Sequence, residues 1–384
     1  MSTASELERH RIEVDRATVE DLRQRLKRTR WPAQPEEPGW ALGADIAYTR
    51  ELCEHWRERY DFSRLERLNE HGSQRWDGLQ FLWVRPPSTY GVPVLLLHGW
   101  PSAPLEYAKA APLIAEAGHD VIVPSLPGYG WSQDPGEPLN VAGMAARLRA
   151  LMEEGLGLDS YAVAGGDWGA MLAARIAFDA PDSVVALHVS TPHTLPLPGD
   201  IADPPLTEAE GAWAERARRW RRREGHHMTI QGLAPDAIST ALNDSPAGLA
   251  AYLLDKYRRW SDCEGEVERR FSKDELCDFL TIYWSTGTIA SSMRLYFGEG
   301  RRRWLLLPEE KITVPAAVAA YPGEMRQDEV LEGESLNPPR EWTERLLSDL
   351  RRWGEMPTGG HFAAFEEPRL YAEDLLAFLG FLEA

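Results

Sequence analysis

The sequence predicts an α/β fold, with a mostly parallel sheet flanked by helices, and three observations support this prediction. From residue 92 onward, short apolar runs each end in a turn that contains Gly or Pro, and helical segments separate the runs. One run leads through a glycine-framed turn, residues 165–169, directly into a segment of small residues. A long insertion with helical spacing, residues 195–305, then interrupts the pattern. We therefore expect one large core with added segments.

The apolar runs predict five strands, and a further strand is expected through Trp353. The five runs are residues 92–98, 121–124, 161–165, 184–189 and 312–320. The core then consists of residues 86–194 and 306–384, and the insertion predicts a helical lid (cap) over the strand ends. The chain has 384 residues, which suits one such core with added segments, because hydrophobic cores stop growing at about 250 to 300 residues.

Residues 1–85 are expected to form an N-terminal extension that packs on the core. Thr18 and Asp21 have the spacing of a capping box, and Leu22 and Leu26 follow at helical spacing. A second helix is expected over residues 48–60. These pieces are too small to fold alone, so we interpret them as a wrapping segment.

The charge balance argues against a nucleic-acid partner. The formal net charge is -18, whereas a nucleic-acid footprint needs clustered Lys and Arg in excess. Residues 216–223 form a basic run, which we interpret as a solvated helix face. No stretch approaches the ~18 apolar residues of a membrane span, and the N-terminus lacks the apolar centre of a signal peptide.

The cysteine content favours a reducing compartment. Cys53, Cys263 and Cys277 are odd in number and far apart, which predicts neither a disulfide framework nor a zinc site. We therefore expect a cytoplasmic protein that needs no metal and no organic cofactor.

The sharpest chemical signal is the segment Gly165-Gly166-Asp167-Trp168-Gly169. It has the spacing of the G-x-S-x-G nucleophile elbow of α/β-hydrolases, with Asp167 at the position of the serine. A carboxylate that attacks an sp3 carbon leaves an ester that water can cleave, whereas a serine would leave an inert ether. The elbow therefore points to epoxides or alkyl halides. The alternative is a strand-to-helix turn in which Asp167 merely caps the helix.

Two loops complete the predicted site. In this fold the oxyanion hole uses one backbone N–H from the loop after an early strand and one from the residue after the nucleophile, here Trp100 and Trp168. The base is expected in the loop after the last strand, where His361 lies in Gly359-Gly360-His361-Phe362.

The acid that orients this base should follow the strand 312–320. Glu324 comes first after the strand end, so we predict that Glu324 holds the imidazole of His361. The carboxylates that follow closely remain alternatives: Asp328, Glu329, Glu332 and Glu334.

Several ordered segments together resemble the microsomal-type epoxide hydrolases, and the match covers most of the chain. These segments are residues 21–32, 98–101, 165–169, 241–250, 283–289 and 359–367. The resemblance implies an α/β-hydrolase fold with a helical lid and an N-terminal extension. It also implies an Asp nucleophile, a His base and a Glu acid, which fall on Asp167, His361 and Glu324. Membrane-resident members carry an N-terminal apolar anchor, which is absent here, so we expect a soluble protein.

Family members use two lid tyrosines to hydrogen-bond the epoxide oxygen. One carries over to Tyr296, in the segment 291–296. The other should precede Ile230-Gln231 by three residues, where this chain has His227, with His226 beside it. Either His227 donates the hydrogen bond, or a nearby Tyr substitutes, or Tyr296 acts alone. A His donor would make the step more pH-sensitive, because its ordinary pKa is about 6.5.

The sequence therefore predicts an epoxide hydrolase that forms a vicinal diol through an ester on Asp167. A haloalkane dehalogenase and a catalytically inactive binding protein of the same fold are the alternatives. The expected partner is a small-molecule epoxide, bulky and apolar or aromatic, because several of the 15 tryptophans fall in the lid. A homodimer is the default expectation for the assembly.

Overall fold

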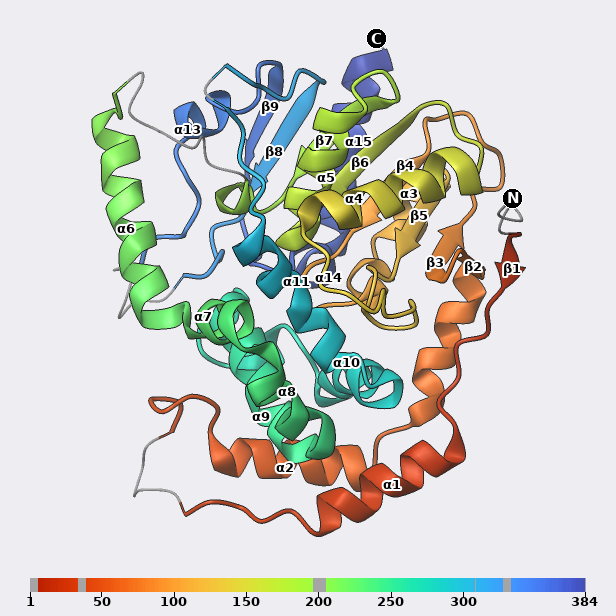
Figure 1. Ribbon diagram of the computed structural model, residues 1–384, viewed down its shortest axis with the longest axis vertical. Coiled ribbons are helices and arrows are strands. Elements are labelled where there is room, and N and C mark those ends of the chain that lie inside the picture. The colour runs from red at the N-terminus through yellow and green to blue at the C-terminus, as the bar shows by residue number, and fades with distance from the viewer. Residues whose placement is uncertain (1–5, 34–38, 196–204, 308, 327–332, 384) are drawn as a thin grey trace.

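The computed structural model describes residues 6–33, 39–195, 205–307, 309–326 and 333–383 and shows one nine-stranded sheet with helices around it (Figure 1). The strand order is β1-β2-β3-β5-β4-β6-β7-β8-β9. The strands are β1 Glu8–Arg9, β2 Ser73–Trp76, β3 Leu79–Val84, β4 Val94–Leu97, β5 Val121–Pro124, β6 Tyr161–Gly165, β7 Val184–Val189, β8 Ala316–Ala320 and β9 Leu350–Glu355. From β5 to β9 every neighbouring pair is parallel, which confirms the predicted mostly parallel sheet.

The predicted strands 121–124, 161–165 and 184–189 are confirmed with the same bounds. The strand predicted at 92–98 is shorter, because only β4 joins the ladder. The strand predicted at 312–320 begins at Ala316, and Ile312 forms only an isolated bridge to Leu347. Pro315 lies between them and has no N–H to donate, so it separates this bridge from the regular ladder.

Residues 1–85 contribute three strands to the same sheet, which sequence analysis did not predict. β2 and β3 are joined by Asp77-Gly78, and both residues have positive φ angles of 45° and 76°. Such a pair is typical of the type I′ turn that closes a two-residue hairpin. β3 then pairs antiparallel with β5 at the edge of the parallel sheet. The Asp-Gly pair was the sequence signal for this hairpin.

The parallel strands are apolar on both faces because helices cover both. Val94 and Leu96 belong to one buried cluster, and Leu95 and Leu97 belong to the other. The helices of the core are α3 Ala111–Glu116, α4 Val141–Ala150, α5 Trp168–Asp179, α13 Arg340–Glu344, α14 Ala363–Glu366 and α15 Pro368–Glu383. Short 3-10 or π turns are η2 Pro104–Tyr107, η3 Leu151–Gly155 and η4 Pro192–Thr194.

In Figure 1 the first helix of the inserted segment lies beside the sheet, most of its other helices lie below the sheet, and the N-terminal helices lie below these. The inserted segment forms α6 Glu208–Glu224, α7 His226–Leu233, α8 Pro235–Asp244, α9 Pro246–Trp260, η5 Val267–Arg269, α10 Lys273–Thr286 and α11 Ile289–Arg301. Within the described residues, none of the helices combines the length and the apolar character that a membrane crossing requires.

The N-terminal segment forms α1 Arg16–Lys27, α2 Ile46–Glu58 and η1 Phe62–His71. The predicted start of α1 at Thr18 is wrong: Asp15 is the N-cap, and its carboxylate accepts a hydrogen bond from the backbone N–H of Thr18. The helix therefore begins earlier than the predicted capping box.

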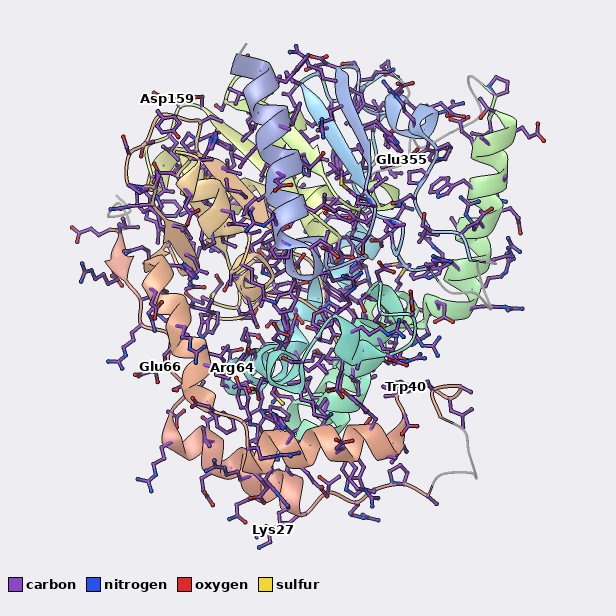
Figure 2. All side chains as sticks on the ribbon, turned by 180° about the vertical axis from the view of Figure 1, so that it is seen from behind. Lys27, Trp40, Arg64, Glu66, Asp159 and Glu355 are labelled. Carbon is purple, nitrogen blue, oxygen red and sulfur yellow. The ribbon has the colours of Figure 1, made fainter. Side chains whose placement is uncertain are left out.

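Buried polar contacts fasten this segment to the inserted helices. Arg64, labelled in Figure 2, donates two hydrogen bonds to the carboxylate of Asp278 on α10, at 3.0 and 2.9 Å. The hydroxyl of Tyr60 donates to the same carboxylate at 2.6 Å. A bidentate pair of this kind fixes orientation as well as distance. The N-terminal segment thus holds α10 in place against the core.

The elbow between β6 and α5 tolerates only glycine at position 169. A Cβ built on Gly169 would lie 1.8 Å from the carbonyl oxygen of Leu97 on β4. We predict that Gly169→Ala lowers the free energy of unfolding by about 2 kcal/mol or more, because backbone has to move. The matched change Gly211→Ala in α6 meets no atom within 4 Å. It should leave stability unchanged or raise it by up to about 1 kcal/mol. Urea unfolding of both variants measures this, and equal midpoints would contradict the packing argument.

Candidate active site

Asp167 lies at a sharp turn between a strand and a helix. β6 ends at Gly165 and α5 begins at Trp168, and Asp167 between them has φ 51° and ψ −128°. Non-glycine residues rarely adopt a positive φ, and such strain is typical of functional sites. A Cβ at Gly165 would lie 2.5 Å from backbone atoms of Gly169, so the strand and the helix approach more closely than side chains allow. The turn therefore projects Asp167 from the sheet.

The carboxylate of Asp167 does not cap the helix that follows it. Asp167 occupies the N-cap position of α5, but its side chain makes no capping hydrogen bond. Its Oδ1 instead accepts a hydrogen bond from the backbone N–H of Trp100 at 2.8 Å. The backbone N–H of Asp167 donates to the Thr191 hydroxyl, just after β7. The interpretation of this residue as a simple helix cap is therefore excluded.

The loop that carries Trp100 lies beside Asp167 because β4 and β6 are neighbours, with Leu97 paired to Gly165. A Cβ at Gly99 would lie 2.2 Å from Oδ1 of Asp167, so only glycine lets the loop approach this closely. Two buried tyrosines from the inserted helices hold the loop from the other side. Tyr257 donates its hydroxyl hydrogen to the carbonyl of Pro101, and Tyr283 donates to the carbonyl of Ser102 at 2.9 Å.

His361 and Glu324 meet Asp167 at the carboxyl end of the sheet. Nδ1 of His361 lies 2.8 Å from Oε1 of Glu324, and its Nε2 lies 3.6 Å from Oδ2 of Asp167. Glu324 is 0% exposed and His361 is 3% exposed. Among the alternatives, Glu334 is turned away and pairs with Arg216. Residues 328, 329 and 332 lie outside the described residues.

The inserted segment also positions the His361 loop. The backbone N–H of His361 donates to the carbonyl of Trp260 at 2.9 Å. The carboxylate of Glu366 accepts hydrogen bonds from the backbone N–H groups of Phe362, at 3.0 Å, and Asp262, at 2.8 Å. The loop therefore keeps its shape only while the end of α9 is packed against it.

The electrostatics of the site favour a charged pair. Burial alone lowers the pKa of His361, but the carboxylates of Glu324, Asp167 and Glu106 overcome this effect and raise the pKa to about 9. For Asp167, burial raises the pKa above its ordinary value. The positive charge of His361 and the backbone N–H groups of Trp100 and Trp168 oppose that rise. At neutral pH the resting site thus holds His361 as an imidazolium beside the carboxyl group of Asp167.

Three residues of the site were missed by sequence analysis. Thr191 holds the backbone of Asp167, as described above. His193, in η4, has its Nδ1 3.8 Å from Oε1 of Glu324, and burial lowers the pKa of this histidine to about 4. Glu106 is buried in η2, and burial raises its pKa to about 7. No motif marks these residues, because they reach the site only through the packing of separate loops.

The two expected donors for an epoxide oxygen lie beside Asp167. Tyr296, on α11, packs edge-on against Trp168, with the ring centroids 4.8 Å apart. His227, on α7, stacks on Trp100 with an interplanar angle of 7°. The centroids of the His227 and Tyr296 rings are 5.9 Å apart.

His226 and Tyr252 are oriented differently. His226 is exposed and its Nε2 lies 2.9 Å from Nζ of Lys256. Tyr252 accepts a hydrogen bond from Gln231 at 3.3 Å. Of the four candidate donors His226, His227, Tyr252 and Tyr296, only His227 and Tyr296 line the cavity that contains Asp167.

Protonation states suit both donors. Burial, followed by the charge of Asp167, raises the pKa of Tyr296 well above 10, so its hydroxyl carries a proton. Burial, followed by the charge of Lys256, lowers the pKa of His227 well below 6.5. The imidazole of His227 is therefore neutral near pH 7. His227 would therefore gain a positive charge only at acid pH, below the pH range in which an ordinary histidine changes charge.

A cavity of about 700 Å³ opens over Asp167, between the strand ends and the inserted helices. Its wall is mostly apolar and aromatic, with Trp168, Trp213, Trp220, Met171, Met228 and Leu336 among its residues. A site of this size and character suits an apolar small molecule.

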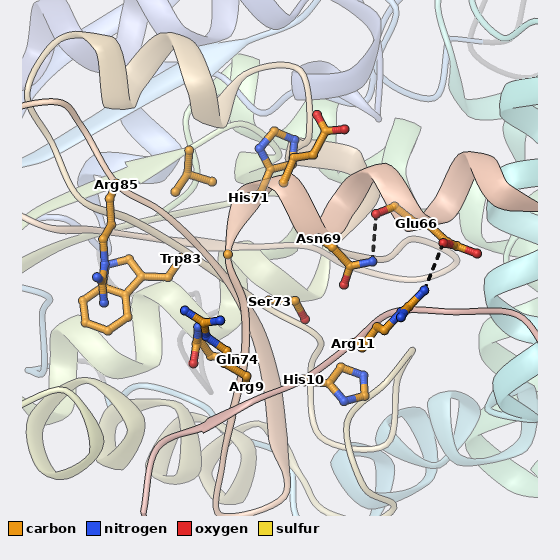
Figure 3. A pocket seen from close by; sticks show the side chains of 13 residues that line it. Arg9, His10, Arg11, Glu66, Asn69, His71, Ser73, Gln74, Trp83 and Arg85 are labelled. Carbon is orange, nitrogen blue, oxygen red and sulfur yellow. Dashed lines mark hydrogen bonds and ion pairs between the residues drawn. The ribbon is translucent and has the colours of Figure 1, made fainter.

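A second hollow, of about 870 Å³, lies far along the sheet against η1, β2 and β3 (Figure 3). Its polar side chains interact with one another: Arg11 lies 3.7 Å from Glu66, and the guanidinium of Arg85 lies over the ring of Trp83. None of the predicted site residues lines it.

The fold and the elbow define an α/β-hydrolase with an aspartate at the nucleophile position. Residues 92–230 match the family described as alpha/beta hydrolase fold, and residues 7–107 match the family described as Epoxide hydrolase N terminus. "Epoxide hydrolase 1" of Sus scrofa is 32% identical over 411 residues, which cover 97% of this chain and 88% of that protein. The chain therefore belongs to the epoxide hydrolase family.

Solved structures agree with this assignment. The juvenile hormone epoxide hydrolase from the silkworm Bombyx mori is 28% identical and superposes with a TM-score of 0.82, over 99% of this chain and 94% of that chain. The epoxide hydrolase of Aspergillus niger shares the fold, with a TM-score of 0.82 at 22% identity over 99% of this chain and 97% of that chain.

The raised pKa of His361 predicts a loss of stability with rising pH. A histidine whose pKa is about 9 in the folded protein and 6.5 when unfolded stabilises the fold fully below pH 6.5 and loses this contribution as pH rises through 9. Between pH 6.5 and 9.5, the wild type should lose up to about 3 kcal/mol more unfolding free energy than His361→Gln. Urea unfolding at both pH values measures this. Equal losses in the two proteins would show that His361 is not held as an imidazolium.

Proposed function

We propose that this member of the epoxide hydrolase family converts an epoxide to a vicinal diol through an ester on Asp167, which a water activated by His361 and Glu324 then hydrolyses. The single observation that supports this best is the buried line of side chains at the elbow. Oδ2 of Asp167 lies 3.6 Å from Nε2 of His361, whose Nδ1 lies 2.8 Å from Glu324. This arrangement matches a nucleophile, a base and an orienting acid.

In the first half-reaction, a carboxylate oxygen of Asp167 attacks one ring carbon of the epoxide and the carbon–oxygen bond breaks. Tyr296 and His227 donate hydrogen bonds to the leaving oxygen from the opposite wall of the cavity. The proton that the new hydroxyl group needs is the one that the resting site holds as the His361 imidazolium. The products of this step are a hydroxyalkyl ester of Asp167 and a neutral imidazole.

Ester formation itself prepares the second half-reaction. The negative charge of Asp167 is one of the causes of the raised pKa of His361, and the ester no longer carries that charge. His361 is then a neutral base, held by Glu324, and it takes a proton from water as the hydroxide attacks the ester carbonyl. The backbone N–H groups of Trp100 and Trp168 face the oxygen that becomes negative. The diol leaves, and the charged pair is restored.

The shape of the cavity supports a bulky, apolar or aromatic epoxide. The helices α6, α7 and α11 supply the wall opposite Asp167, and we interpret the inserted helices as the lid. Tryptophans on this wall offer large flat surfaces that bury much apolar area for little loss of side-chain freedom.

Trapping the ester tests the mechanism directly. The purified wild type is mixed with styrene oxide, quenched in acid and digested. We expect diol in solution and a mass increase equal to the substrate on the peptide that contains Asp167. His361→Gln should form this ester more slowly, because water has to supply the proton that the imidazolium supplies in the wild type, and should accumulate it without releasing diol. Asp167→Asn should form neither. Bromide release from 1-bromobutane without any diol would indicate a dehalogenase instead. The absence of both adduct and products would indicate a binding protein.

Substitution of the two donors tests their assigned roles. We predict that Tyr296→Phe lowers the single-turnover rate of ester formation by about 10²- to 10⁴-fold, because the leaving oxygen loses a hydrogen-bond donor. His227→Phe should lower the same rate, and His227→Tyr should preserve it. Tyr252→Phe is the matched control, because Tyr252 packs on Trp100 but does not line the cavity. A rate of ester formation that is unchanged in Tyr296→Phe would remove this residue from the mechanism.

A further inference from the structure

The basic run on α6 places one arginine at the cavity without a carboxylate partner. Arg216 pairs with Glu334, and Arg218 and Arg222 pair with Glu215. Arg221 lines the cavity over Asp167, and its guanidinium forms no ion pair or hydrogen bond with any residue that the structure describes. The run is therefore not simply a solvated face, because Arg221 is directed to the site.

A second cation reaches the same cavity from another element. Arg303 follows the end of α11 and lines the cavity together with Arg221. Both residues are exposed, which places them at the solvent side of the cavity. Partial loss of hydration at the guanidinium, followed by the positive charge of Arg303, lowers the pKa of Arg221. Among charged groups, the guanidinium of Arg303 thus has the largest effect on the pKa of Arg221.

A buried carboxylate on this wall already accepts hydrogen bonds from the backbone. Glu299 also lines the cavity, but its Oε2 accepts a hydrogen bond from the backbone N–H of Val141 and its Oε1 accepts one from that of Trp304, at 3.0 and 2.6 Å. Arg303 acts on Glu299 only through its charge, without an ion pair between them in the described part of the chain.

Two like charges at the mouth of an apolar cavity repel each other, and the repulsion is unfavourable unless an anion lies between them. The chain has 60 acidic residues, so carboxylates for neutralising the pair are plentiful. The charge of Arg221 also acts on His193 at the inner wall, where it adds to the effect of burial in lowering the pKa of that histidine. The charge of Arg221 therefore reaches the inner wall, where the charge of Glu324 opposes its effect on His193.

We propose that the cavity binds epoxides that carry a carboxylate, with the epoxide ring at Asp167 and the carboxylate held between Arg221 and Arg303. Guanidinium groups match the two oxygens of a carboxylate. The apolar wall between the two ends suits an aryl or alkyl acid. The negative charge of Asp167 repels a carboxylate from the inner end, so the two polar ends fix the direction in which the substrate enters. This inference rests on the proposed epoxide hydrolysis and adds the substrate class.

Binding is tested first with probes that cannot react. Tryptophan fluorescence of the wild type is titrated with 4-phenylbutyrate and with 4-phenylbutanamide, since Trp168, Trp213 and Trp220 line the cavity. We expect the carboxylate to bind about tenfold more tightly than the amide. Arg221→Gln and Arg303→Gln should each abolish most of this preference, and high salt should weaken it. Arg222→Gln is the matched control, because Arg222 lies on the same helix and pairs with Glu215 outside the cavity.

Turnover is tested with 10,11-epoxyundecanoate and its methyl ester. For Arg221→Gln and Arg303→Gln we expect kcat/KM to fall about tenfold with the acid, mainly through KM, and to stay within twofold with the ester. Arg222→Gln should resemble the wild type with both.

The outcomes separate this inference from the proposed function. Diol from both substrates without any preference for the carboxylate, or a preference that survives in both cavity variants, overturns the inference and leaves the hydrolase function intact. Carboxylate-selective binding that depends on Arg221 and Arg303, with no diol from any epoxide, supports the anion site and overturns the hydrolase function.

Discussion

The site depends on one constraint of packing, which is the contact between backbones at the end of β4 and β6. Gly169 lies against the carbonyl of Leu97, and Gly99 lies against the carboxylate of Asp167, at distances that no Cβ allows. This contact holds Asp167 in a strained conformation and brings the N–H of Trp100 to its Oδ1. The proposed nucleophile and oxyanion donors are therefore positioned by the same backbone contact, before any substrate binds.

In the proposed mechanism, electrostatic coupling allows the same rigid site to carry out two successive steps. His361 lies among buried carboxylates, so the imidazolium is stable while Asp167 is charged. A reaction that converts Asp167 to a neutral ester changes the field at His361 by one unit charge, in surroundings of low dielectric. The same residue can then release a proton in one half-reaction and accept one in the next, without any movement of the fold.

The inserted helices and the N-terminal segment contribute to this site at a distance. Tyr257 and Tyr283 hold the loop of Trp100, and Trp260 holds the loop of His361. The N-terminal segment in turn holds α10 through the buried carboxylate of Asp278. Polar contacts that are buried and fully paired specify one arrangement more strictly than apolar packing does. The inserted helices therefore form part of the site as well as its cover.

The sequence by itself determined the parallel strands, the elbow at Asp167 and the loops that carry Glu324 and His361, because apolar runs, glycine spacing and chain order are local or sequential signals. Only the tertiary structure decided which carboxylate meets His361 and that His227, not its neighbour His226, faces the cavity. It also placed Thr191, His193 and Glu106 at the site and paired β3 with the edge of the parallel sheet. In the basic run on α6, it left the guanidinium of Arg221 without a partner among the described residues. These outcomes depend on contacts between residues far apart in the chain, and no local pattern encodes such contacts.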